Sequence, residues 1–194
     1  MTERGAWTAR TVGLLVGLAV CSAALAFAVT FLNFAARAIM SIGGFVAAGG
    51  PYVIAFPAPL WAGLVPVSIL GGFLFGGLSL LFSLRAGGFN LLLPVWVGLF
   101  VSLGYQFAVM GLSPPGDGGV AWGWIICAVV FVPMGLAPIL LALRGEAVLR
   151  PVPVTTGWRP YHDAGYRATY WACVIAGAIV GLVGAWMLFA AVAG

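Results

Sequence analysis

The sequence predicts an all-α membrane protein, a polytopic bundle of five transmembrane helices, and three observations lead to this fold class. First, 63% of the 194 residues are hydrophobic and only 6% are charged, whereas a soluble domain carries about 25% charged residues. Second, five long uncharged stretches each have room for the roughly 20 residues that a helix needs to cross a hydrocarbon core. Third, the apolar residues run continuously and do not alternate with a period of two, which favours helices over a β-barrel.

The five helices are expected within the uncharged stretches, whose limits are Arg10, Arg37, Arg85, Asp117, Arg144 and Arg167. In chain order, the predicted spans are residues 11–33, 61–84, 91–111, 122–143 and 168–192, within a single membrane domain that covers residues 1–194. The first span follows two arginines, as the apolar part of a signal peptide does. Its apolar run is longer than about 20 residues, which indicates an uncleaved signal anchor.

The distribution of arginine predicts the orientation of the bundle. All eight basic residues are arginine, and seven of them share one side when the N-terminus is cytoplasmic and the C-terminus lies outside. Only Arg37 then lies outside, which agrees with the positive-inside rule. A sixth helix at residues 38–56 would move Arg85 and the four arginines of the predicted cytoplasmic loop 144–167 to the outside. Residues 34–60 are therefore predicted to form an outer loop, either re-entrant or resting on the membrane or on protein.

Glycine pairs inside the predicted spans indicate how the helices pack. Two glycines four residues apart lie on one helix face and allow another backbone to approach closely, which provides dispersion contacts that lipid does not supply equally well. Such pairs are Gly13 with Gly17, Gly72 with Gly76, and Gly177 with Gly181. Looser pairs of small residues, Gly98 with Ser102 and Gly104 with Ala108, extend the pattern to the third span. We expect these faces to form contacts within the chain, with contacts to another protein as the alternative.

Prolines interrupt two of the predicted spans. Pro66 falls in the second span, and Pro133 and Pro138 fall in the fourth. Because proline lacks a backbone N–H and displaces the preceding turn, kinks are expected at these positions. Such kinks serve helix packing in most cases, and the alternative is that they line a transport site.

The few polar residues offer little chemistry. No acidic residue lies inside a predicted span, which argues against a proton- or sodium-coupled transporter of the usual type. Asn33 and Gln106 are expected to form interhelical hydrogen bonds rather than to bind substrate. His162 is interpreted as a solvent-facing interfacial histidine. The alternatives are a single axial ligand of a pigment or haem and a weak acid–base pair with Asp163.

Cysteines and aromatic residues in the spans are interpreted as structural. Cys21, Cys127 and Cys173 show no paired spacing and are expected to be inert buried thiols. Tyr166 and Tyr170 fall at the predicted inner interface and are expected to anchor the last span there. The sequence requires no cofactor, and bound structural lipids are expected.

The predicted outer loop resembles a loop in a known family. Its residues include Gly49-Gly50-Pro51-Tyr52 and, further on, Pro57-Ala58-Pro59. This pattern resembles a family of uncharacterised multi-pass membrane proteins from high-GC bacteria, in which a Gly-Gly-Pro-Tyr turn is followed by Pro-x-Pro. The resemblance covers residues 34–60 and implies no activity. Family members often have cysteines at the positions of Val46 and Ala58, and neither is present here, so a disulfide-pinned loop is not implied.

The same loop is the predicted docking segment. It is apolar and almost uncharged, so we expect it to fold into the mouth of the bundle or to dock on another membrane protein. The residues predicted to make these contacts are Arg37, Tyr52, Pro57 and Pro59.

Groups for chemistry are scarce and apolar contact surface is abundant, which together predict a role in assembly. The leading hypothesis is a non-catalytic accessory subunit of a larger complex in the bacterial inner membrane, with an energy-transducing complex as one candidate. Its expected partners are other integral membrane subunits and lipids. Nucleic acid is excluded because the charges are scattered and form no basic patch. The alternative is a small homo-oligomeric transporter or channel that uses Arg37, Gln106, Pro133 and Pro138, and a third hypothesis is a lipid-modifying enzyme that uses His162 and Asp163.

Overall fold

A computed structural model describes residues 8–41, 59–86, 91–114, 119–143 and 164–193 of the chain. Within these residues the secondary structure is helical, and five helices are long and apolar enough to cross a membrane. This result confirms the predicted all-α, five-span fold class. The helices are α1 (Ala9–Ser41), α3 (Leu64–Ala86), α4 (Leu92–Leu112), α5 (Trp122–Leu143) and α6 (Ala164–Ala193), and a short 3-10 helix, η1 (Leu60–Gly63), leads into α3.

The prediction was wrong about the end of the first helix. α1 continues to Ser41 instead of ending at residue 33, so Arg37 is an exposed helical residue and not a loop residue. Residues 34–41 contain three alanines and neither glycine nor proline, and arginine is itself a good helix former. Arg37, which limits the first uncharged stretch of the sequence, therefore lies within α1 and not beyond its end.

The other helix ends follow local signals. α1 begins after Thr8, whose hydroxyl accepts a hydrogen bond from the Thr11 backbone N–H at 3.3 Å, as an N-cap residue does. α4 ends ahead of Pro114, which disfavours helical geometry at the residue before it. α6 begins at Ala164, so the predicted cytoplasmic loop 144–167 is shorter than expected, and its residues 144–163 lie outside the described part of the chain.

The three prolines have different positions in their helices. Pro66 does not interrupt α3, because it lies in the first turn, where the missing N–H has no intrahelical partner to lose. Pro133 and Pro138 do lie inside α5, as expected, and the helix continues through both. Each leaves the carbonyl four residues earlier without its usual intrahelical donor.

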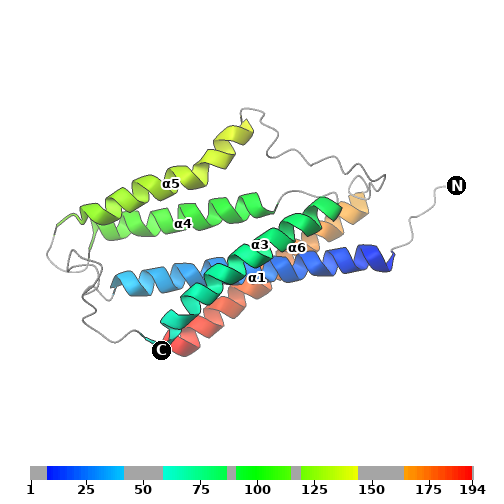
Figure 1. Cartoon of the computed structure of the whole chain (residues 1–194), viewed down its shortest axis with the longest axis horizontal. Coiled ribbons are helices and arrows are strands. Elements are labelled where there is room, and N and C mark those ends of the chain that lie inside the picture. Colours follow the sequence, from blue (N-terminus) through cyan, green and yellow to red (C-terminus); the bar gives the residue numbers. More distant parts are fainter. Residues whose placement is uncertain (1–7, 42–58, 87–90, 115–118, 144–163, 194) are drawn as a thin grey trace.

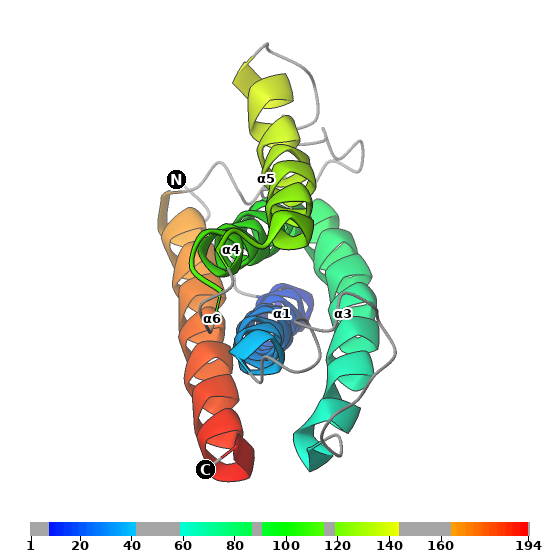
Figure 2. The same ribbon diagram turned by 90° about the vertical axis from the view of Figure 1, so that its left-hand side faces the viewer.

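The helices are arranged around α1. Figure 2 shows α1 between α6 and α3, with α4 above it in this view, and α1 contacts all three of these helices. α5 packs along α4 and lies at the edge of the bundle (Figure 1). Accordingly, 39% of the most apolar window of α1 is buried, against 6% for α4 and 11% for α5. The structure therefore consists of an inner group, α1 with α3 and α6, and an α4–α5 hairpin that joins this group through α4.

Candidate functional site

The closest helix contact is the seam between α1 and α6. A Cβ atom placed on Gly177 would collide with the carbonyl oxygen of Ala19, and one on Gly181 would collide with the carbonyl oxygen of Ala23. In the same seam, the Ser22 hydroxyl donates a hydrogen bond to the Val174 carbonyl at 2.7 Å. Glycine at these two positions therefore lets the backbone of α6 lie directly on α1, as the four-residue spacing indicates.

The other predicted glycines have looser surroundings. A Cβ on Gly17 would meet the ring of Phe82 at 2.7 Å, and one on Gly76 would meet the Leu92 side chain at 3.2 Å. A Cβ on Gly72 would be in ordinary contact with Ala28 at 3.9 Å, whereas nothing described lies within 4 Å of a Cβ on Gly13. Of the six, Gly177 and Gly181 alone meet backbone atoms in the described residues.

A second glycine seam, between α4 and α5, was only partly predicted. A Cβ on Gly104 would meet Val132, one on Gly111 would meet Ile125, and one on Gly135 would meet Val101, all within 2.7 Å. The sequence pattern that marks this seam is a spacing of seven: Gly104 with Gly111 on α4, and Ala128 with Gly135 on α5. This spacing differs from the four-residue spacing of the predicted glycine pairs. A seven-residue period is typical of coiled-coil packing.

A side chain on α4 compensates for one of the prolines in α5. Pro138 has no N–H, so the Met134 carbonyl loses its intrahelical donor. The Trp96 indole Nε1–H donates to this carbonyl at 3.1 Å. Aromatic rings continue the seam, with centroids 5.3 Å apart for Phe100 and Phe131 and 5.0 Å apart for Phe107 and Phe131. The hairpin is thus held together by side-chain packing and by a hydrogen bond to the carbonyl that Pro138 leaves without a donor.

The far side of α5 is apolar and faces away from α4. We call it the α5 outer face; its residues are exposed and recur at helical spacing, namely Trp122, Ile126, Val129, Pro133, Leu136 and Leu140. Among the described helices, α5 packs closely on α4 alone. This face is the candidate docking surface of the chain.

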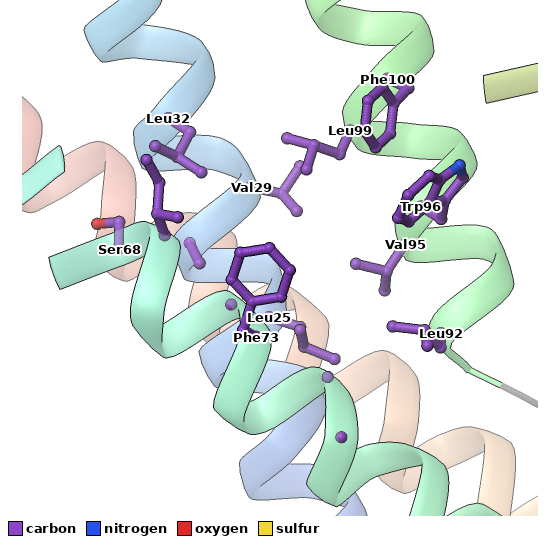
Figure 3. A pocket seen from close by; sticks show the side chains of 15 residues that line it. Leu25, Val29, Leu32, Ser68, Phe73, Leu92, Val95, Trp96, Leu99 and Phe100 are labelled. Atoms are coloured by element: carbon purple, nitrogen blue, oxygen red, sulfur yellow. The ribbon is translucent and has the colours of Figure 1, made fainter. Parts of the chain in front are cut away.

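A pocket of about 400 Å³ lies between α1, α3 and α4 (Figure 3). Leu25 and Val29 of α1, Phe73 of α3, and Val95 and Leu99 of α4 are among its lining side chains. The lining is almost entirely apolar. Its polar side-chain groups point elsewhere: the Ser68 hydroxyl is turned away from the pocket in Figure 3, and the Trp96 indole N–H is bonded to Met134.

Asn33 does not form the interhelical hydrogen bond that was expected. Its side-chain nitrogen donates to the Val29 carbonyl at 2.9 Å, one turn back in α1. Its side-chain oxygen is buried without a hydrogen-bond partner among the described residues. Gln106 is half-buried on α4. The short side chain of Asn33 reaches a carbonyl of its own helix more easily than a group on a neighbouring helix. This explains why the expected interhelical hydrogen bond is not formed.

Tyr166 and Tyr170 do more than anchor α6 at an interface. Both are buried. The Tyr170 hydroxyl donates to the Ser83 hydroxyl, and the Tyr166 hydroxyl donates to the Ala86 carbonyl, each at 3.4 Å. They therefore connect α6 to the end of α3. Nothing in the residue types distinguishes such tyrosines from interfacial ones.

The remaining predicted site residues form no cluster. Arg37 is exposed on α1, and Pro59 is half-buried ahead of η1. Tyr52, Pro57 and His162 lie outside the described residues. Cys21 is buried, Cys127 and Cys173 are half-buried, and all three are free thiols. Within the described ranges, no three His, Cys, Asp or Glu side chains come together in a way that could hold a metal ion.

No protein-family model, curated protein or solved structure matches the chain. The resemblance of residues 34–60 to a bacterial membrane-protein family therefore stays a prediction.

Proposed function

We propose that this chain is a non-catalytic accessory subunit of a larger complex in a bacterial inner membrane, with an energy-transducing complex as one candidate. Its N-terminus is cytoplasmic and its C-terminus is outside. The α5 outer face contacts another integral membrane subunit, and the other exposed helix faces contact lipid.

The observation that carries this proposal is the position of α5. The helix is held firmly to α4 by Gly104, Gly111 and Gly135 and by the hydrogen bond from Trp96, yet it lies outside the group formed by α1, α3 and α6. A rigid hairpin at the edge of a bundle presents a preformed surface, so binding requires little ordering of side chains or backbone.

The test uses a substitution that lipid tolerates and a protein interface does not. Val129 on the α5 outer face and Val180 on α6 are each 66% exposed. Val129→Trp keeps the surface apolar but adds a large ring, which would clash with a tightly packed partner and would be accommodated by fluid chains. Val180→Trp is the matched control.

The measurement is mass spectrometry of the complex extracted gently from its own membrane through a tag on this chain. We expect stoichiometric membrane subunits with the unchanged chain and with Val180→Trp, and their loss with Val129→Trp. A chain that purifies without stoichiometric partners, or partners retained equally by both variants, would overturn the proposal.

The transporter or channel alternative has less support. Pro133 and Pro138 lie within one continuous helix, and Trp96 already binds the carbonyl that Pro138 frees. The Met134 carbonyl, already bonded to Trp96, is therefore not free to bind a permeating solute. A lone homo-oligomer in the experiment above would nevertheless favour this alternative. The enzyme hypothesis depends on His162 and Asp163, outside the described residues.

A further inference from the structure

We infer that the pocket between α1, α3 and α4 holds one acyl chain of a membrane phospholipid as a retained structural lipid. This inference goes beyond the proposed function and does not depend on it, because it concerns a different surface from the α5 outer face.

The chemistry of the lining restricts the occupant. The side chains around the pocket are aliphatic or aromatic, and the Ser68 hydroxyl and the Trp96 indole N–H are directed away from it (Figure 3). A polar solute or a group of waters would find no hydrogen-bond partner there, and apolar cavities of this kind stay dry and take up hydrocarbon. At about 400 Å³, the space is also within the range of small-molecule binding pockets.

The position of the pocket makes it accessible from the membrane. Its lining residues on α1 and α3, including Leu25 and Gly72, lie near the middle of the two spans. Phe73, at its edge, is 75% exposed, and Ile69 and Trp96 beside it are also exposed. A chain can therefore enter sideways from the hydrocarbon layer, in which phospholipid acyl chains are the most abundant species.

The shape of one wall suits a flexible linear chain. Gly72, Gly76 and Gly77 of α3 line the pocket, and no other described helix has an atom within 4 Å of a Cβ placed on Gly77. A smooth wall of this kind gives an extended chain contact along its length. Because α3 and α4 touch each other only slightly, a chain in this position contacts both and supports α4 and the hairpin that it carries.

The experiment measures lipid that remains bound after purification. Each protein is purified in mild detergent after reconstitution in vesicles of palmitoyl-oleoyl phosphatidylethanolamine and phosphatidylglycerol, and bound lipid is counted by native mass spectrometry. Gly77→Leu places a side chain in the pocket. Its matched control is Gly71→Leu. Gly71 is on the same helix and does not line the pocket, and a Cβ placed there also has no atom of another described helix within 4 Å.

A second pair of variants keeps the test valid if Gly77→Leu fails to fold. Phe73→Ala removes part of the pocket wall, and Leu70→Ala truncates a similarly exposed side chain of α3 that does not line the pocket. Both residues are exposed, so neither change should unfold the bundle. Folding of all four variants is checked by gel filtration and circular dichroism.

We expect one retained phospholipid in the unchanged chain and in both controls. In Gly77→Leu and Phe73→Ala, retention should fall roughly tenfold, which corresponds to lost burial of about two methylene groups. Equal retention in all variants, or none in the unchanged chain, would overturn the inference. Protein purified directly from its native membrane that carries an isoprenoid lipid instead would overturn the assignment to an acyl chain.

Discussion

The hydrogen bond from Trp96 to the Met134 carbonyl leads to a sharp prediction about stability. Trp96→Phe removes the indole donor and keeps an aromatic ring beside Phe100, whose centroid lies 4.4 Å from that of Trp96. The Met134 carbonyl would then have no donor, because Pro138 supplies none. We expect the free energy of unfolding to fall by about 1–2 kcal/mol, between the usual value of a hydrogen bond inside a membrane protein and the penalty for an unsatisfied carbonyl.

The matched background is Pro138→Ala, which restores an N–H that can donate to Met134 within α5. If the indole acts through this carbonyl, Trp96→Phe should be less harmful in that background, with a coupling energy of about 0.6–1.7 kcal/mol. The assay is reversible unfolding by sodium dodecyl sulfate in mixed micelles, followed by circular dichroism for the four proteins of the cycle. A loss that is the same in both backgrounds, within about 0.3 kcal/mol, would refute the reasoning and assign the effect to ring packing alone.

Three further predictions concern the inner group of helices. Gly181→Ala should lower the free energy of unfolding in the same assay by about 1–3 kcal/mol, since the added methyl meets the α1 backbone, whereas Gly13→Ala, with open space around it, should leave it unchanged or raise it by up to about 1 kcal/mol. Tyr170→Phe should lower it by about 1 kcal/mol through loss of a buried hydrogen bond, while Tyr105→Phe, on an exposed side chain, should have no effect; equal losses would contradict the role of the buried hydroxyl. Cys21, which is buried, should resist maleimide in micelles and react only after unfolding, as peptide mass spectrometry would reveal, and rapid labelling of the folded protein would disprove its burial.

Hydropathy and charge were sufficient to predict the five helices because length and apolar content are properties of each segment alone. The end of α1 was missed because Arg37 interrupts the uncharged stretch with one charge, and a charge does not by itself end a helix. The α1–α6 seam could be anticipated from Gly177 and Gly181, although the identity of the opposite helix could not, because glycine spacing marks a face and not its partner.

The candidate sites were less predictable than the helices. Trp96 and Pro138 are far apart in the sequence, and their relation appears only when α4 and α5 lie side by side. The pocket likewise forms where α1, α3 and α4 leave a space between their side chains, and no residue type in the sequence predicts such a cavity. Tyr52 and Pro57, predicted to dock the outer loop, lie outside the described residues, so this role stays a prediction.

The seam between α1 and α6 has a consequence for the order of biosynthesis. α1 leaves the ribosome first and α6 last among these helices, and the Ser22–Val174 hydrogen bond joins residues 152 positions apart. The α4–α5 hairpin can close as soon as its two neighbouring segments are inserted, because its contacts are local in sequence. The surface of α1 around Ala19 and Ala23, in contrast, stays uncovered until α6 has been made and inserted. During that interval this surface is open to insertion factors and to membrane proteases. Of the described helices, α6 is the one whose insertion covers it.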